Sequence, residues 1–240
     1  MNLGKAFTYP FEDKAWTTKL GLAIVITIVP ILNFATVGYV IEVMRRVLRS
    51  DPELLPDWSD LGRKFMDGLI AFLASLVYSL PFLILILPPL FLMMVPAVLA
   101  GNSSTQNIGQ ALSTAALVGL SCLGCVGVLY GLALSLVFPC AYLTFARQGK
   151  FSDFFQLREF FAMIARNPGA FFTAWGIYLA TTIATSLISG LVGGLLGWIP
   201  CLGQLVTIVI GLGGGIYLLL IFADVFGQFG LAQGRAALQA

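Results

Sequence analysis

The charged residues of this chain are confined to short segments, and long apolar runs lie between them. One of these runs, Leu69 to Leu99, contains no charged residue. Of the 240 residues, 59% are hydrophobic and only 10% are charged, whereas a soluble domain usually carries about a quarter charged residues. So few charges cannot solvate the surface of a globule of this size. The sequence therefore predicts an all-α, polytopic transmembrane helical bundle, formed by one membrane domain over residues 1–240.

Every lysine and arginine falls on one predicted side of this bundle. We expect six membrane helices, arranged as three hairpins, with no basic residue in the far-side turns. The thirteen basic residues lie before, between or after the hairpins: Lys5, Lys14, Lys19, Arg45, Arg46, Arg49, Arg63, Lys64, Arg147, Lys150, Arg158, Arg166 and Arg235. Under the positive-inside rule, this pattern places both termini in the cytoplasm.

Residues 1–19 are predicted to lie on the membrane surface and to lead into hairpin one, residues 20–49. Aromatic residues alternate with charges there, which suits the headgroup region, and Trp16 is the residue expected at the interface. A disordered tail is the alternative. Glu12 and Asp13 interrupt the apolar core that a cleaved signal peptide needs, so we expect the first apolar run to be retained.

Residues 57–67 are predicted to form an amphipathic helix that lies parallel to the membrane. Three apolar residues fall at i, i+3 and i+7 and share one face: Trp58, Leu61 and Phe65. This face is expected to meet the membrane or the cytoplasmic ends of the bundle. Arg63 and Lys64 are expected to face water or anionic headgroups, because charges cannot enter hydrocarbon cheaply.

Hairpin two is assigned to residues 68–146. Four prolines interrupt its first apolar run: Pro81, Pro88, Pro89 and Pro96. Because proline removes a helical hydrogen bond and clashes with the preceding turn, we expect a kinked helix to about Leu87 and then a bent outer extension. A polar far-side loop, residues 101–110, leads to a fourth helix that is kinked near Pro139.

A second amphipathic stretch, residues 152–166, precedes hairpin three at residues 169–227. Its expected apolar stripe has four members: Phe154, Leu157, Phe161 and Ile164. Phe154 is expected at the membrane interface. Residues 228–240 are polar enough to form a cytoplasmic tail.

The order amphipathic segment, helix, far-side turn, helix occurs three times along the chain. The turns Val29–Asn33 and Ile199–Gly203 are alike. Two explanations remain open: a structural repeat of three parallel hairpins, or convergent turn chemistry.

Glycines recur at a spacing of four in the later helices. The pairs are Gly127 and Gly131, Gly190 and Gly194, Gly193 and Gly197, and Gly211 and Gly215. Small residues four apart let helix backbones approach closely. Membrane helices four, five and six are therefore expected to pack tightly.

Glu42 and Asp224 are the only acidic residues inside apolar runs. A carboxylate within a membrane is a functional hypothesis by default. Glu42 has Arg45 and Arg46 at i+3 and i+4, which favours a local ion pair. For Asp224 two interpretations stay open: a pair with a basic residue of the cytoplasmic layer, or a functional polar site.

Residue types that carry chemistry are scarce in this chain. There is no His, which removes the commonest metal ligand and the usual general base near neutral pH. Cys122 and Cys125 have the spacing of a metal or redox pair, but without His a packing role is favoured. We expect no catalytic residue, no cofactor and no metal, and therefore no enzyme. The net charge of +2 gives no nucleic-acid footprint, so the expected partners are the lipid bilayer and other membrane protein subunits.

Several phrases of the sequence resemble one family together. They are AFTYPFEDKAW (6–16), GY (38–39), MRRVLR (44–49), LPDWSDLGRKFMDG (55–68) and DVFGQFG (224–230). They resemble an uncharacterised prokaryotic membrane protein family, domain of unknown function 4013. The resemblance implies a multi-pass protein of the prokaryotic cytoplasmic membrane, and it implies no activity or site residue. We expect a non-enzymatic membrane subunit or scaffold; a small-molecule or lipid transporter is the alternative.

Overall fold

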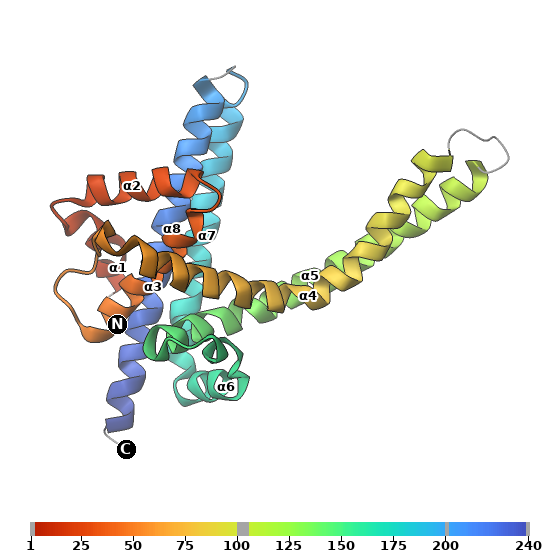
Figure 1. Ribbon diagram of the computed structural model, residues 1–240. Helices are drawn as coiled ribbons and strands as arrows, with labels where there is room; N and C mark the ends of the chain where they lie inside the picture. Colours follow the sequence, from red (N-terminus) through yellow and green to blue (C-terminus); the bar gives the residue numbers. More distant parts are fainter. Residues whose placement is uncertain (1–2, 100–105, 200–201, 239–240) are drawn as a thin grey trace. The chain divides into compact units, whose positions relative to one another are not determined.

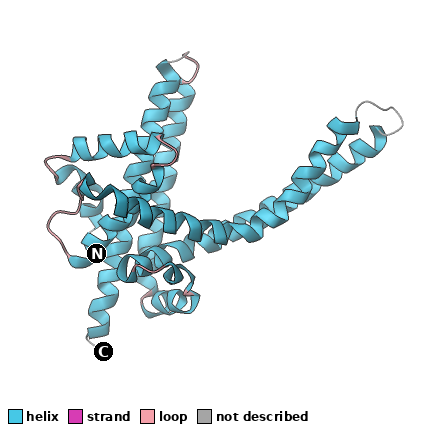
Figure 2. Cartoon of the chain, in the orientation of Figure 1, coloured by secondary structure: helices cyan, strands magenta, loops and turns pink. Residues whose placement is uncertain are grey.

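The computed structural model describes residues 3–99, 106–199 and 202–238, and this part of the chain contains helices and connecting turns without any strand (Figures 1 and 2). The helices are α1 (Leu3–Glu12), α2 (Trp16–Ile28), α3 (Asn33–Arg49), α4 (Leu61–Leu99), α5 (Gln106–Gln148), α6 (Leu157–Arg166), α7 (Pro168–Leu196) and α8 (Leu202–Leu238), with short 3-10 helices η1 (Trp58–Asp60) and η2 (Phe151–Phe155). The predicted all-α class is confirmed.

Four segments are long and apolar enough to cross a membrane: Trp58–Val95, Ile108–Gln148, Pro168–Leu196 and Gly203–Gly234. The first begins in η1 and continues in α4, and the others lie in α5, α7 and α8. This agrees with a multi-pass membrane protein. The six expected spans are not found. The 13 residues of α2 rise about 20 Å at 1.5 Å per residue, whereas a bilayer core is about 30 Å thick. In addition, α2 runs across the α7–α8 pair and not along it (Figure 1).

Without six spans, the expected repeat of three parallel hairpins is not shown. Hairpin one differs most from the expected pattern, because its first arm is too short to span and lies crosswise. The chain instead divides into two compact units, Met1–Phe72 with Val137–Ala240, and Leu73–Leu136. We describe each unit by itself.

The second unit is a helical hairpin formed by the later part of α4 and the earlier part of α5. The Tyr130 hydroxyl donates a hydrogen bond to the Tyr78 carbonyl, and the Tyr130 ring stacks on Phe82 at 6.4 Å. Phe82 also occupies the space beside Gly127, where an added Cβ would lie 2.7 Å from the ring. A methyl group at Gly131, by contrast, would meet nothing within 4 Å.

The expected end of the helix near Leu87 is wrong, because α4 continues as one helix to Leu99. Proline weakens a helix but does not have to end it. In a long apolar segment, continuing the helix satisfies more backbone groups than a break would. Residues 100–105, which include the first half of the expected polar loop, lie outside the described residues, and the second half, residues 106–110, belongs to α5.

The first unit is built around α8, which contacts α1, α2, α3 and α7. Glycines of α8 make the contact with α3 close. A Cβ at Gly227 would lie 2.7 Å from Val47, and one at Gly230 would lie 2.8 Å from Leu48. Large aromatic side chains fill the contact of α8 with α7: Phe171, Tyr178, Phe222, Phe226 and Phe229.

Helices α7 and α8 pack against each other, as expected, but of the glycines in their predicted pairs only Gly193 meets the other helix. Gly193 lies 3.3 Å, measured from an added Cβ, from Thr207, and Gly214 lies 3.0 Å from Thr185. Four glycines of the predicted pairs face open space: Gly190, Gly194, Gly211 and Gly215. Spacing alone could not tell which of two neighbouring glycine stripes faces the partner helix.

The two amphipathic segments also differ from expectation. Residues 57–67 do not form a separate helix, because η1 leads directly into α4 and no break occurs at Gly68. Residues 152–166 divide into η2 and α6. The buried residues of α6 are Phe160 and Met163, whereas the predicted stripe residues Leu157 and Phe161 are exposed.

The described parts of both terminal segments are helical. Residues 3–12 form α1, whose Ala6 and Tyr9 are buried. The expected cytoplasmic tail, residues 228–240, continues α8 as far as Leu238.

Helices α3 and α4 cross with their backbones in direct contact. A Cβ added at Gly38 would lie 1.7 Å from the Lys64 carbonyl oxygen, and one added at Gly68 would lie 1.7 Å from the Phe34 carbonyl oxygen. Each glycine therefore meets the residue four positions before the other glycine. No other residue type fits at either position without separating the helices.

We predict that Gly38→Ala destabilises the protein by about 3 kcal/mol, because its methyl group overlaps backbone atoms that cannot move without displacing α4. The measurement is the thermal unfolding midpoint of the purified protein in detergent. Gly62→Ala is the matched control. An added Cβ there meets nothing within 4 Å. Because alanine favours a helix over glycine by about 0.5–1 kcal/mol, the unfolding midpoint of this variant should stay the same or rise. Equal midpoints for the two variants would contradict the crossing.

Candidate functional site

The crossing of α3 and α4 brings four charged residues together, which we call the α3–α4 charge cluster: Glu42, Arg45, Arg63 and Asp67. Glu42 is only 6% exposed. Its Oε2 lies 3.1 Å from Arg63 Nη2 and 3.5 Å from Arg45 Nη1. Arg45 also donates a hydrogen bond to Asp67 on α4. Two guanidinium groups thus balance two carboxylates across the helix crossing.

Arg45 extends the α3–α4 charge cluster to the end of α5. Its Nε donates to the Ala146 carbonyl at 3.3 Å, and its guanidinium lies 5.7 Å from the ring centroid of Phe145. Because every charge here has an opposite partner, removing one partner would leave a largely buried charge alone, which is strongly unfavourable. The arrangement can stabilise helix contacts, and it presents no free base or nucleophile.

The predicted local pair of Glu42 therefore forms with one of its two expected arginines. Arg45 is the partner, at i+3. Arg46 turns away and donates to the carbonyls of Glu53 and Leu55, at 3.0 and 3.4 Å. Arg46 thus holds the connector after α3.

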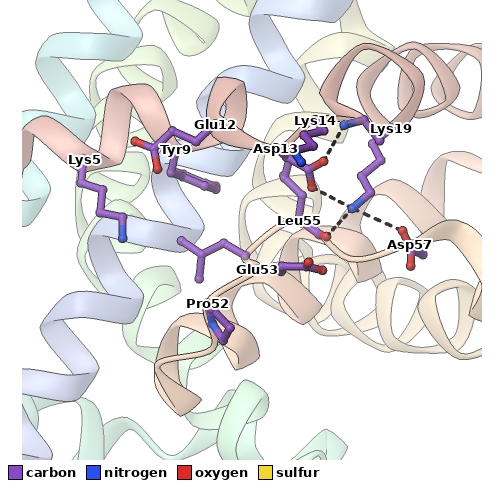
Figure 3. Close-up of a pocket in the computed structure, with 12 residues that line it drawn as sticks. Lys5, Tyr9, Glu12, Asp13, Lys14, Lys19, Pro52, Glu53, Leu55 and Asp57 are labelled. Carbon is purple, nitrogen blue, oxygen red and sulfur yellow. Dashed lines mark hydrogen bonds and ion pairs between the residues drawn. The ribbon is translucent and has the colours of Figure 1, made fainter.

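A second charged group surrounds Lys19, and we call it the Lys19 cluster (Figure 3). Lys19 Nζ donates to Asp13 Oδ2 at 2.8 Å and to the Leu55 carbonyl at 2.9 Å. It also lies 3.2 Å from Asp57 Oδ1. The three protons of the ammonium group are therefore used, and three separate segments of the chain meet at one side chain.

The Lys19 cluster shifts the pKa values of its members. The hydrogen bond from Lys19, helped by the Ala15 backbone N–H, holds the pKa of Asp13 below its ordinary value, although burial acts in the opposite direction. Burial lowers the pKa of Lys19, but hydrogen bonds to Asp13 and Asp57 outweigh it and raise that pKa overall. Both groups are held in their charged forms at neutral pH.

The Lys19 cluster forms one wall of a cleft of about 510 Å³ (Figure 3). Both signs of charge line it, and the lining residues are Lys5, Tyr9, Glu12, Asp13, Lys14, Ala15, Lys19, Pro52, Glu53, Leu54, Leu55 and Asp57. With four carboxylates and three ammonium groups, the cleft has no strong preference for an anion or a cation.

Trp58 connects η1 to the start of α2 and to α3. Its Nε1 donates to the Lys19 carbonyl at 3.0 Å, and its ring stacks on Tyr39 with centroids 4.5 Å apart. On the same predicted face, Leu61 is half-buried, and Phe65 packs edge-on against Phe34 at 5.8 Å.

Arg63 and Lys64 were both expected to face water or headgroups, but only Arg63 is exposed. The Arg63 side chain is 53% exposed, but Lys64 is only 3% exposed. The physical reason is the crossing at Gly38, which places the Lys64 backbone against α3 and covers its side chain.

Asp224 lies buried on α8, with 2% of its surface exposed. Its Oδ2 accepts a hydrogen bond from Gln228 Nε2 at 2.6 Å. Tyr9 of α1 packs nearby and donates to the Leu220 carbonyl at 2.9 Å. Burial, and secondly the charge of Asp224, raise the pKa of Tyr9 well above its ordinary value. Lys5 is the basic group that interacts electrostatically with Asp224.

The remaining predicted residues lie in different surroundings. Trp16 packs edge-on against Phe11 at 5.1 Å. Phe154 is fully buried and lies between Tyr142 and Phe145, at 5.5 and 4.8 Å, so it is a core residue of the first unit and not an interfacial one.

The cysteines also separate by surroundings. Cys140 is buried, which suits packing, whereas Cys122 and Cys125 are free and exposed on α5. Cys201 lies outside the described residues. Within the described part of the chain, no three or more Cys, Asp or Glu side chains gather in a way that could hold a metal ion.

The Lys19 cluster was missed by sequence reasoning. Lys19 and Asp13 are six residues apart, so they do not share a helix face. The contact with Leu55 is made by a backbone carbonyl, which side-chain patterns in a sequence do not predict. The only available signal was the presence of a lysine at the polar end of an apolar run.

We predict that Lys19→Met destabilises the protein by about 1–3 kcal/mol, the range for lost hydrogen bonds to charged groups. The variant leaves Asp13 and the Leu55 carbonyl without their shared donor. Lys14→Met is the control, because Lys14 is an exposed lysine of the same cleft. Thermal unfolding in detergent is the readout, and a control variant as unstable as Lys19→Met would argue against the cluster.

The depressed pKa of Asp13 also predicts a pH dependence. A carboxyl group with a lowered folded-state pKa contributes stability above its unfolded pKa of about 3.9, and the contribution is lost as the pH falls through the folded value. The difference in unfolding midpoint between the wild type and Asp13→Asn should therefore be constant between about pH 7 and 5 and shrink below about pH 4. A gap that stays constant down to about pH 3 would refute this role of Asp13.

The family comparison covers most of these elements. A family model described as Protein of unknown function (DUF4013) matches residues 21–198, which include the whole α3–α4 charge cluster but neither Lys19 nor Asp224. No curated protein and no solved structure matches the chain. Since the match spans well over half of the sequence, it confirms the resemblance seen in the sequence. The chain belongs to the DUF4013 family of proteins of unknown function.

Proposed function

We propose that this chain is a non-enzymatic membrane subunit or scaffold that makes lateral contacts with lipids and other membrane proteins. We place it in a prokaryotic cytoplasmic membrane with both termini in the cytoplasm, on the basis of the family and of the one-sided distribution of basic residues. The observation that carries the proposal is a contrast: the clustered charges are engaged with one another, while the long apolar helices leave large surfaces open.

The charges of the two clusters are paired. In the α3–α4 charge cluster and the Lys19 cluster, each charge faces an opposite charge or a backbone carbonyl. An acid–base catalyst needs a titratable group within reach of a substrate. Groups held by such partners instead contribute to the architecture.

Helices α7 and α8 each have an open face with small residues. An added Cβ at Gly190 or Gly194 meets nothing within 4 Å, and the intervening Leu191 is 67% exposed. On α8 the same holds for Gly211 and Gly215. In a bilayer, open small residues four apart are favourable positions for the close approach of another helix.

The transporter alternative receives less support. A transport site at Asp224 requires a cavity that reaches it. Residues 220–227 of α8 are buried without interruption. The cleft beside Lys19, a second cleft beside Gln233 and an apolar groove between α2 and α8 do not include Asp224 in their linings.

The test is purification of the full chain from its native membrane in mild detergent, followed by mass spectrometry. We expect a reproducible partner protein or a homo-oligomer. A lone monomer in every preparation would contradict the proposal.

A matched pair of variants locates the contact. Gly194→Leu should reduce recovery of the partner without lowering the unfolding midpoint, because its surroundings are open. Gly169→Leu, at the other end of α7 and equally open, should leave recovery unchanged. Equal recovery for both variants would show that the Gly190–Gly194 face is not the contact.

A further inference from the structure

Helix α6 presents an apolar surface that no described part of the chain covers. Phe161 is 63% exposed and Leu157 is 45% exposed. The neighbouring elements also carry exposed aromatic residues, Phe151 in η2 and Phe172 in α7. The sequence pattern predicted a stripe containing Leu157 and Phe161, but the structure shows that this stripe points away from the core.

The surface lies where the chain passes between two membrane helices. The candidate span of α5 ends at Gln148, and the candidate span of α7 begins at Pro168. The connection contains only η2 and α6, so α6 must stay near the bilayer surface. A helix in this position meets the headgroup layer if one of its faces is apolar.

The residues of α6 separate into three faces at about 100° per residue. Phe160 and Met163 form the buried face. Leu157 and Phe161 form the apolar exposed face. Arg158 lies next to it, about 60° around the helix from Phe161, whereas Arg166 lies about 140° from Phe161, on the polar side of the helix. An apolar face bordered by a basic residue is typical of a helix that lies in a membrane interface, because the long basic side chain reaches the headgroups.

The orientation of α6 is fixed by its contacts with α8. Gln233 Nε2 donates to the Met163 carbonyl at 2.6 Å, and Phe160 is 1% exposed. The helix therefore cannot rotate to bury Phe161 without losing these contacts. A cleft of about 340 Å³ between α6 and α8 is lined by Arg147, Glu159, Arg166 and Gln233, among others. This cleft opens on the polar side of α6.

The charge of the connection selects the kind of lipid. Residues 147–166 contain four basic residues, Arg147, Lys150, Arg158 and Arg166, and two acidic ones, Asp153 and Glu159, which gives four minus two, or +2. Asp153 is buried and accepts a hydrogen bond from the Lys150 backbone N–H at 2.7 Å. The surface charge that remains is mainly basic, and it attracts anionic headgroups.

We propose that α6 is an anionic-lipid binding surface: Leu157 and Phe161 enter the acyl boundary of the cytoplasmic leaflet, and Arg158 binds lipid phosphate groups. The surface anchors the connection between α5 and α7 to the membrane. This role is independent of the lateral partner proposed above, because it uses another element and another ligand.

The test uses the full chain with its cysteines replaced by alanine and one nitroxide spin label, reconstituted in nanodiscs. Labels are placed at Phe161 or, as the matched control, at Ala162, which is exposed one position further around the helix. We expect the label at 161 to be accessible to oxygen and shielded from a water-soluble nickel complex, and the label at 162 to show the opposite. A label at Leu157 repeats the measurement if the variant at 161 does not fold.

Lipid composition tests the charge selection. Replacing phosphatidylcholine by phosphatidylglycerol should lower the nickel accessibility of the label at 161 further. The variant Arg158→Gln should lose this response, whereas the control variant Arg166→Gln, on the polar side of the helix, should keep it. Equal nickel accessibility at 161 and 162 would overturn the proposal, because both positions would then lie in water. A label at 161 that is shielded from both reagents would also overturn it, since a protein would then cover the surface. A phosphatidylglycerol response that persists in Arg158→Gln would refute the role of Arg158.

Discussion

The crossing of α3 and α4 at Gly38 and Gly68 is the constraint on which the first unit depends. Each glycine lies against a backbone carbonyl of the other helix, so the two backbones touch without intervening side chains. Glu42 and Arg45 follow Gly38 by one and two helical turns and therefore face the first turns of α4. A separation of even the width of a methyl group would lengthen the ion pairs across the crossing, because their distances are set by the backbones.

The charge clusters connect segments that are distant in the sequence. Arg45 joins α3 to α4 and to the end of α5, and Lys19 joins the start of α2 to the connector after α3. Buried charge pairs rarely add much net stability, but they make incorrect arrangements costly, since a displaced partner leaves an unpaired charge. In a chain whose other surfaces are almost uniformly apolar, these few polar contacts give the polar layer a defined geometry. The open surfaces of α7 and α8 remain available for lipids or other helices.

Composition and charge distribution were sufficient to predict the helical class, the membrane setting and the ion pair between Glu42 and Arg45. They did not predict which apolar segments span. The α2 segment is about as apolar as α8, but α2 has only 13 residues. They also did not predict which face of each amphipathic helix is buried. Periodicity placed Leu157 and Phe161 on one stripe of α6, yet the core is reached by Phe160 and Met163, and only tertiary packing decides between neighbouring faces. The contacts of Lys19 were missed because one of them is a backbone carbonyl.

The central claim is that the glycine crossing positions the charge pair between Arg45 and Asp67. The most direct measurement is the coupling free energy of a double-mutant cycle with Arg45→Gln and Asp67→Asn, measured once in the natural background and once in the Gly38→Ala background. We expect a coupling of about 0.5–3 kcal/mol in the natural background, as for residues in direct contact, and its loss when the crossing is opened. A coupling of zero in the natural background, or one that persists unchanged with Gly38→Ala, would contradict the account.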